Sequence, residues 1–213
     1  MDPKQIVRSG YDAASYHYRS DADLRPGDYP SEATLHYHDW LDRLEPLLSP
    51  DARLLELGCG CGLPVARRLT SKYRYTGVDL SPVQCRRAQE NAPTAEILSA
   101  DMTALDFPPA NFDAILAFFS IIHIPVEEQP LLYKRITSWL RPGGLFMVTL
   151  PLTAWTGTED NWHDSGATMY WSHADTPTYL QWLDVLGFDI LWTSFLPEGE
   201  NGFNLVLAEK KLQ

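Results

Sequence analysis

Short apolar runs recur along the chain, and segments with a helical spacing of apolar positions separate them. A run that is apolar throughout is typical of a strand covered on both faces, as in a parallel sheet. Five such runs predict strands at 53–58, 75–80, 96–101, 112–121 and 145–151. The intervening segments therefore have to supply the helices that cover the sheet.

Helices are predicted between these strands at 63–72, 81–92 and 129–140. For the second of them, Ser81 is a suitable N-cap, Pro82 suits the first helical position and Gln84 completes a capping box. Strands and helices that alternate in this way predict an α/β fold with a parallel sheet, helices on both of its faces and right-handed crossovers.

The C-terminal part departs from this alternation. A helix predicted at 176–188 is followed by two apolar runs, 189–197 and 203–211, with the short Gly-containing loop EGENG between them. Two strands joined by such a loop form a hairpin, so we expect the last strand to be antiparallel.

Two further segments flank or interrupt this core. A helix is predicted from Ser31 to Leu48, and with the tyrosine-rich start of the chain it makes residues 1–48 an N-terminal helical cap. Residues 151–176 form an aromatic-rich insertion that is too long for a plain connector, so we expect a functional lid or short elements of its own. We treat residues 1–213 as a single domain.

Composition and charge narrow the class of protein. The chain has 213 residues and a formal net charge of −11, which disfavours nucleic acid as a partner. No apolar run approaches the roughly 20 residues needed to span a bilayer, and the start MDPKQIVRSG has no apolar leader region. A cytoplasmic location with no membrane partner is the default expectation; the oligomeric state is open.

The three cysteines are Cys59, Cys61 and Cys85. This small, odd set disfavours a disulfide framework. Cys59 and Cys61 form a C-x-C pair without a second pair, whereas structural zinc sites use four ligands. We therefore expect no metal, and interpret the pair as small residues in a tight turn.

The glycine run LGCGCG at 57–62 follows a predicted strand and precedes a helix, which is the context of a nucleotide-binding loop. In the dinucleotide pattern G-x-G-x-x-G, Leu63 would stand in place of the third glycine. Glu56 precedes the loop, and a carboxylate there is a poor neighbour for a diphosphate but a good one for an ammonium group.

The E-x-G-x-G-x-G run resembles the first motif of class I S-adenosylmethionine-dependent methyltransferases. Further motifs follow in the family's order: Asp79 after the second strand, Asp101-Met102 after the third, FDAILAFFSIIHI around the fourth, and LRPGG before the fifth. The start YDAASYHY is similar to the Y-D-x-x-A-x-x-Y helix of the small-molecule branch that includes quinone-biosynthesis methyltransferases, with Ser15 in place of alanine.

This resemblance implies a Rossmann-like, doubly wound seven-stranded sheet in the order 3-2-1-4-5-7-6, with strand 7 antiparallel and an N-terminal helical lid. It implies S-adenosylmethionine as cofactor and S-adenosylhomocysteine as product. Asp79 would bind the ribose hydroxyls, Asp101 the adenine, and Glu56 the amino-acid portion. The cofactor-binding residues that the resemblance predicts are Tyr11, Tyr18, Glu56, Gly58, Cys59, Gly60, Gly62, Asp79, Leu80, Asp101, Met102, Phe118 and Phe119.

The residues for catalysis are less well defined. His123 follows the fourth strand, where many relatives carry a histidine near the acceptor, and it is a candidate general base or a structural histidine. His163 and His173 in the insertion are alternative bases. The insertion also supplies four aromatic candidates for binding the acceptor, unless they only form a satellite hydrophobic cluster: Trp155, Trp162, Tyr170 and Trp171.

The function that follows is in-line methyl transfer to an oxygen, nitrogen or sulfur atom of a small molecule. The position after the fourth strand reads AFFS rather than the D/N-P-P-[YF] motif of amino-methylating DNA enzymes. Two alternatives stay open: an enzyme of this fold that binds the cofactor but catalyses isomerisation or cyclisation, and a non-catalytic cofactor-binding protein.

Overall fold

The computed structural model describes residues 2–19, 37–198 and 201–212. The segment 20–36, which includes the predicted cap Ser31, lies outside the described residues. Within them the predicted N-terminal cap contributes two helices, α1 (Pro3–Tyr18) and α2 (Tyr37–Leu44), followed by the 3-10 turn η2 (Glu45–Leu47). No described helix combines the length and the apolar character that crossing a bilayer requires.

The seven-stranded sheet has the predicted order. Its strands are β1 (Arg53–Leu57), β2 (Arg74–Asp79), β3 (Glu96–Ser99), β4 (Phe112–Ala117), β5 (Leu140–Pro151), β8 (Phe188–Glu198) and β9 (Asn201–Lys210). They are arranged β3-β2-β1-β4-β5-β9-β8. The first five strands run parallel and β9 is antiparallel to β5, which confirms the expected topology.

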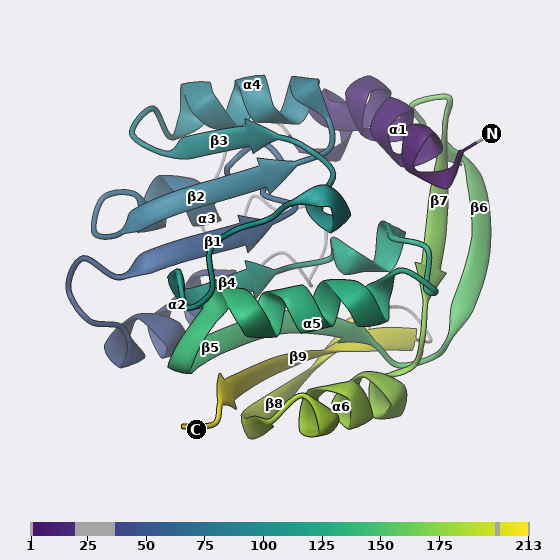
Figure 1. Ribbon diagram of the computed structural model, residues 1–213. Helices are drawn as coiled ribbons and strands as arrows, with labels where there is room; N and C mark the ends of the chain where they lie inside the picture. Colours follow the sequence, from purple (N-terminus) through teal and green to yellow (C-terminus); the bar gives the residue numbers. More distant parts are fainter. Residues whose placement is uncertain (1, 20–36, 199–200, 213) are drawn as a thin grey trace.

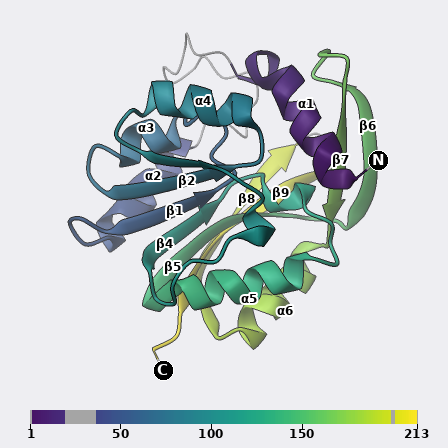
Figure 2. The ribbon, with the colours of Figure 1, turned by 45° about the horizontal axis from the view of Figure 1, so that its top comes forward.

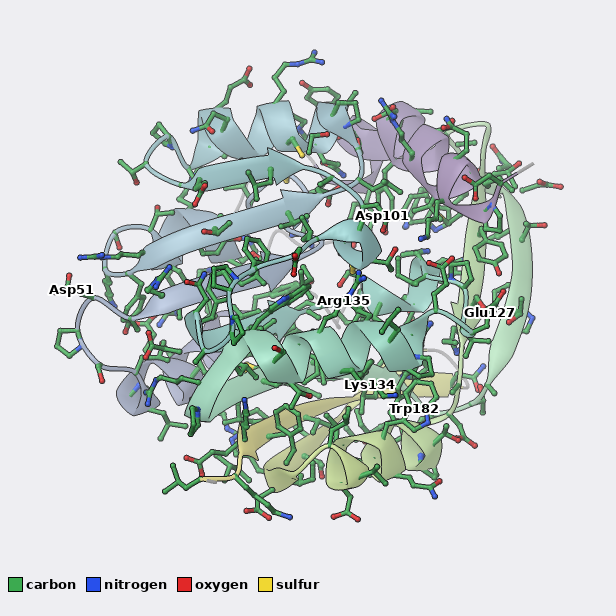
Figure 3. The ribbon with its side chains drawn as sticks, in the orientation of Figure 1. Asp51, Asp101, Glu127, Lys134, Arg135 and Trp182 are labelled. Carbon is green, nitrogen blue, oxygen red and sulfur yellow. The ribbon has the colours of Figure 1, made fainter. Side chains whose placement is uncertain are left out.

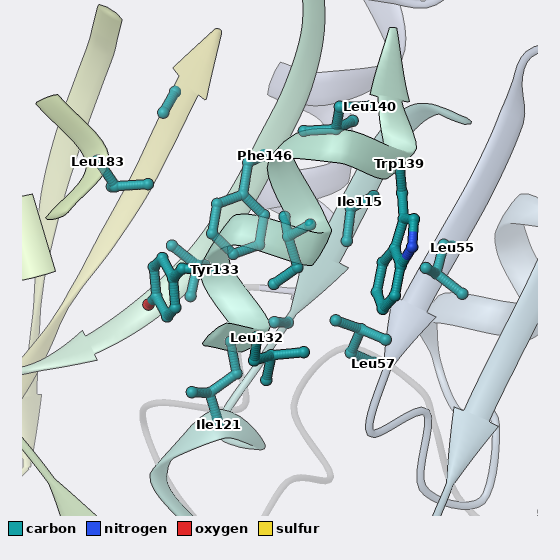
Figure 4. Packing of buried hydrophobic residues seen from close by; sticks show 14 of the residues in the cluster. Leu55, Leu57, Ile115, Ile121, Leu132, Tyr133, Trp139, Leu140, Phe146 and Leu183 are labelled. Atoms are coloured by element: carbon teal, nitrogen blue, oxygen red, sulfur yellow. The ribbon is translucent and has the colours of Figure 1, made fainter. Parts of the chain in front are cut away.

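The central strands bury both faces, which explains why their sequences are apolar throughout. On one face Leu55 and Ile115 pack against Trp139 and Phe146, in a cluster that includes residues of α5 (Gln129–Trp139) and α6 (Thr176–Val185) (Figure 4). On the other face Leu54 belongs to a second cluster with residues of α2 and α3 (Val65–Leu69). Helices therefore cover the sheet on both sides (Figures 1 and 2).

The helix α4 (Pro82–Asn91) begins as its sequence predicts, with one difference. Ser81 Oγ accepts a hydrogen bond from Gln84 N at 3.1 Å, and Pro82 occupies the first turn. The side chain of Gln84, however, accepts a hydrogen bond from Ser15 Oγ of α1 at 2.9 Å. A contact with a distant helix thus takes the place of the second half of the predicted capping box.

The insertion at 151–176 forms elements of its own. It contains the antiparallel hairpin β6 (Trp155–Trp162) and β7 (Ala167–His173), which is separate from the main sheet. The hairpin stands against α1 at the end of the sheet toward which β1 to β4 point (Figures 1 and 2). Gly10 makes this contact close, since a Cβ there would lie 2.8 Å from Met169 Cε.

Two strand boundaries differ from prediction by four residues or more. The strand predicted at 112–121 ends at Ala117, because the chain turns at Phe119, whose φ is +51°, and continues into the short 3-10 turn η4 (Ile121–His123). The strand predicted to begin at Leu145 begins at Leu140, so the RPGG turn lies within β5. A register shift in the pairing with β4 accommodates that turn.

Candidate functional site

A single cavity gathers the ends of β1, β2 and β4 with one face of α1. In open α/β sheets a ligand binds at the carboxyl ends of the strands, where the chain order reverses. The cavity has about 820 Å³ of space between its lining atoms, part of it open to solvent.

The glycine loop after β1 forms one wall. Gly58 N and Cys59 N both donate to the Val78 carbonyl of β2, at 2.7 and 3.0 Å, which holds the loop against the neighbouring strand. Gly58 has a φ of +82°, and a Cβ there would lie 2.2 Å from Ser120 Cβ. Gly60 has a φ of +52°, and a Cβ added there would have no atom within 4 Å. The loop is therefore closed on one side and offers bare backbone to the cavity on the other.

Asp79 occupies the end of β2, where its carboxylate faces the loop. Its Oδ2 accepts from Gly60 N and its Oδ1 from Ser81 N, both at 2.9 Å. Burial nevertheless raises the pKa of Asp79 to about 6, because these two amide donors only partly replace the lost water. A ligand with hydroxyl groups beside Asp79 would stabilise the charged form.

Glu56 and Arg19 bring a buried carboxyl group and a guanidinium to the same cavity. Burial raises the pKa of Glu56 to about 8, although the Tyr75 hydroxyl donates a hydrogen bond to Glu56 Oε2 and the charge of Arg19 acts in the opposite direction. The Arg19 guanidinium donates to the Leu63 carbonyl and lies 5.4 Å from the centre of the Tyr37 ring. A zwitterionic group would match these two side chains, because an ammonium beside Glu56 would favour the charged carboxylate and an anion would lie toward Arg19.

A hydrogen-bonded pair, Tyr11 and His123, connects α1 with η4 at the cavity. His123 Nδ1 lies 2.7 Å from the Tyr170 carbonyl oxygen, which can only accept, so Nδ1 carries the hydrogen. Nε2 then accepts from the Tyr11 hydroxyl at 3.0 Å. Burial lowers the pKa of His123 to about 4, and the imidazole is neutral at physiological pH. The Trp171 ring packs on it at 4.4 Å between centroids.

Twelve of the predicted residues line this cavity. They are Tyr11, Tyr18, Glu56, Gly58, Cys59, Gly60, Asp79, Leu80, Met102, Phe118, Phe119 and His123. Gly62 does not line it; a Cβ there would lie 3.1 Å from Ala88 Cα of α4, so this glycine lets the loop pack on a helix. Asp101 follows β3 beneath α1 (Figure 3); it is not among the lining residues, and its carboxylate accepts a hydrogen bond from Lys4.

The aromatic residues of the insertion stand behind the cavity wall rather than on it. Trp162 is buried against Tyr11 and Tyr18, at 5.1 and 5.3 Å between ring centroids. Trp171 and the Tyr170 carbonyl support His123, as described above. Trp155 is 47% exposed. The structure thus places these four predicted substrate contacts in a cluster that supports α1 or on the surface.

The two alternative histidines are also absent from the cavity lining. His163 is exposed in the connection between β6 and β7, where its ring lies 4.5 Å from that of Trp162. His173 ends β7, and its Nδ1 lies 3.4 Å from the Ala174 carbonyl. Of the three predicted bases, the structure brings His123 to the site.

Sequence reasoning missed several lining residues. They are Val7, Arg19, Tyr37, Cys61, Leu63, Val65, Gln84, Ser120 and Ile124. Val7 had a usable signal, because it precedes Tyr11 by four positions and shares its helical face. Arg19 had none, since its role depends on where α1 ends relative to α2. Within the described residues, no group of three His, Cys, Asp or Glu side chains could hold a metal ion.

Comparisons with known proteins find methyltransferases both by sequence and by fold. Residues 54–144 match the family described as "Methyltransferase domain". An uncharacterized methyltransferase of Mycobacterium bovis is 35% identical over 129 residues, which cover 59% of this chain and 63% of that protein. The 27-O-demethylrifamycin SV methyltransferase of Amycolatopsis mediterranei is 35% identical over 120 residues, with coverage of 53% and 43%. The matches thus span less than two thirds of either relative.

Solved structures share the fold over almost the whole chain. The magnesium protoporphyrin IX methyltransferase of Synechocystis, crystallised with bound S-adenosylmethionine, has a TM-score of 0.71 at 16% identity and covers 99% of this chain and 98% of its own. The (4+2)-cyclase SpnF has a TM-score of 0.70 at 20% identity, with coverage of 99% and 97%. The comparisons thus show a fold shared with these enzymes over almost the whole chain, and a sequence match to the methyltransferase domain over residues 54–144.

The different surroundings of two loop glycines predict different costs of substitution. Gly58→Ala adds a methyl group that would lie 2.2 Å from Ser120 Cβ, in addition to the strain at a φ of +82°. We expect it to lower the free energy of unfolding by about 3 kcal/mol. Gly60→Ala meets open space and should cost only about 1 kcal/mol for its positive φ. Urea denaturation of both variants measures the difference; equal losses would contradict this account of the loop.

Proposed function

We propose that this protein binds S-adenosylmethionine in the cavity and transfers its methyl group to an oxygen, nitrogen or sulfur atom of a small molecule. The observation that carries the proposal is the combination of polar groups in one cavity. These groups are the buried carboxyl at the end of β2, the bare loop backbone after β1, and the side chains of Glu56 and Arg19. These groups suit a vicinal diol and an amino acid zwitterion, the two polar ends of this cofactor.

The cavity residues divide the cofactor between them in the following way. Asp79 accepts hydrogen bonds from the ribose hydroxyls, which are stronger than neutral ones because the acceptor is charged. Met102, Leu80 and Ile124 give apolar walls for the adenine, and Arg19 and Glu56 hold the carboxylate and ammonium groups. Bound here, S-adenosylmethionine supplies a methyl group made electrophilic by the neighbouring sulfonium.

The chain's own contribution to the chemistry is orientation and the exclusion of water. The helix α1, supported by the hairpin, presents Val7 and Tyr11 to the cavity. Because His123 Nε2 accepts the Tyr11 hydrogen, the hydroxyl oxygen of Tyr11 is free to accept a hydrogen bond from the acceptor molecule. His123 is too weakly basic, with a pKa of about 4, to hold a proton at rest. The pair therefore orients an acceptor atom whose proton leaves readily.

The acceptor is an uncharged small molecule in this proposal. The Asp, Glu, Lys and Arg side chains that line the cavity, within the described residues, are Arg19, Glu56 and Asp79. All three are assigned to the cofactor, so a charged acceptor would enter without a partner and pay a desolvation penalty. A rifamycin methyltransferase among the relatives is consistent with a small-molecule acceptor. The cytoplasmic location and the absence of a nucleic-acid partner stay predictions.

A non-methylating reaction is the second candidate, because a cyclase shares the fold over 99% of this chain. Release of S-adenosylhomocysteine in the presence of a panel of uncharged phenols, amines and thiols distinguishes the two. Stoichiometric release with a methylated product supports methyl transfer. Product formation without that release would select the second candidate.

Calorimetry with S-adenosylhomocysteine tests the binding site itself. We expect saturable binding to the full chain, and a loss of affinity of about 100-fold in Asp79→Asn, because the amide turns one acceptor oxygen into a donor beside Gly60 N. The matched control is Asp113→Asn. Asp113 lies near the start of β4, whereas the cavity lies beyond the end of that strand, and it pairs with Arg141. Binding of a nicotinamide dinucleotide in preference to S-adenosylhomocysteine would refute the proposal.

The buried carboxyl of Asp79 also predicts a pH dependence of binding. Its pKa is raised to about 6, and the ribose hydroxyls favour the charged form, so affinity falls as the pH drops through about 6. The Glu56→Gln variant removes the other lining carboxyl, and His123 titrates lower, near 4. In that variant we expect about tenfold weaker binding of S-adenosylhomocysteine at about pH 5 than at about pH 7. A flat profile would contradict the assignment of Asp79.

A further inference from the structure

The helix α1 forms one wall of the cavity and is held by two different kinds of contact. Lys4, Val7, Tyr11 and Tyr18 follow one another at helical spacing, so they share a face. Val7, Tyr11 and Tyr18 line the cavity, whereas Lys4 at the start of the helix does not. The two ends of α1 therefore have separate attachments to the rest of the domain.

The C-terminal end is attached by buried polar contacts. Arg87 Nη1 of α4 donates to the Ser15 carbonyl at 2.6 Å and to Ser15 Oγ at 2.7 Å, and Ser15 Oγ donates to Gln84 at 2.9 Å. Ser15, Gln84 and Arg87 are at most 1% exposed. Breaking these bonds would leave a buried guanidinium and a buried amide without partners, which is costly.

At the N-terminal end, Val7 packs against Met169 of the hairpin, and the polar contacts that the described first turn makes with other elements come from the ammonium group of Lys4. Lys4 Nζ donates to Asp101 Oδ2 at 2.8 Å, to Thr103 Oγ1 at 2.7 Å and to Glu128 Oε2 at 2.5 Å. Three acceptors saturate the three hydrogens of the ammonium. They come from the end of β3, from the 3-10 turn η3 (Met102–Ala104) and from the residue before α5, so one side chain joins α1 to two other parts of the domain.

These ionic contacts are more accessible to water than the contacts at the other end. The side chains of Lys4, Asp101 and Glu128 are 16%, 26% and 41% exposed. Ion pairs in such surroundings are weakened by salt and can be replaced by water at moderate cost. Between the two attachments, the one at Lys4 is therefore the easier to release.

We propose that Lys4, with Asp101, Thr103 and Glu128, is a latch that holds α1 closed over the cavity, and that α1 opens at its N-terminal end while its C-terminal end stays attached to α4. Lys4 is a positioning residue: it acts through Val7 and Tyr11, which touch the cavity. The latch also includes Asp101, which directly precedes the lining residue Met102. The Asp101 carboxylate also accepts from Thr103 N, so it connects the position of α1 with the part of the cavity wall around Met102. In stating which ligand the latch retains, the inference rests on the proposed function.

Amide hydrogen exchange tests the latch without any ligand. In Lys4→Met we expect exchange at residues 7–11 to accelerate about tenfold, while residues 14–18 change by less than about twofold. The matched control is Lys72→Met, which removes the same charge from an ion pair with Glu45 that is remote from α1. Unchanged exchange at residues 7–11, or equal acceleration in both halves of α1, would overturn the proposal.

A double substitution tests whether the ion pair is the cause. Glu128→Gln alone should accelerate exchange at residues 7–11 by about threefold. Combined with Lys4→Met, it should add nothing to the effect of Lys4→Met, because the two groups act through one interaction. Additive effects would show that Lys4 stabilises α1 in some other way.

The dissociation rate of S-adenosylhomocysteine, measured by stopped flow, gives a functional readout. For the unsubstituted protein and Lys72→Met we expect the rate to rise several-fold between about 50 mM and about 500 mM NaCl, as salt weakens the latch. Lys4→Met should dissociate about tenfold faster at low salt and respond little to added salt. An unchanged rate and salt response in Lys4→Met would overturn the latch. If the unsubstituted protein binds no S-adenosylhomocysteine, the proposed function fails and the exchange experiment still decides the latch.

Discussion

Gly58 brings the loop after β1 so close to the chain after β4 that even a methyl group would lie 2.2 Å from Ser120 Cβ. Ser120 Oγ in turn donates to the Leu57 carbonyl at 2.5 Å, which ties the ends of the two strands together. With the loop fixed on this side, Gly60 N faces Asp79 at 2.9 Å on the other. The bare backbone of the loop and the buried carboxylate are therefore held next to each other by this close approach.

The elements that carry this arrangement were predictable because their sequence signals are local. A strand buried on both faces must be apolar throughout, as in β1, and Ser81-Pro82 can start a helix wherever it lies. The hairpin of β6 and β7 was less evident, because its connection holds non-glycine residues at positive φ, such as Asn161 and Asp164, in place of a short glycine turn. The aromatic residues of this insertion gave no sign of which wall they would support.

The candidate site was predictable to the extent that it follows strand ends. Asp79 and Glu56 lie where parallel strands end, and the topology brings such positions together. Arg19 and Tyr37 depend instead on how α1 and α2 pack on the sheet, and no spacing in the sequence encodes that. For Asp101 the sequence predicted the position, just after a strand, but not the partner. Its carboxylate accepts a hydrogen bond from Lys4, which is 97 residues away in sequence.

The glycine loop is similar to loops that bind dinucleotides and to loops that bind S-adenosylmethionine, and the charges around the cavity distinguish between these two ligands. Burial raises the pKa of Asp79 and of Glu56, which means that each carboxylate lacks part of the solvation it would have in water. A ligand with an ammonium and a sulfonium returns favourable charge to that region. A dinucleotide would bring a diphosphate beside the same two acids, where Arg19 is the only cationic side chain among the described lining residues. Repulsion would then add to the cost of desolvation. Under the proposed function, the two acids would therefore favour the cationic ligand both by disfavouring the anionic one and by binding the hydroxyl and ammonium groups.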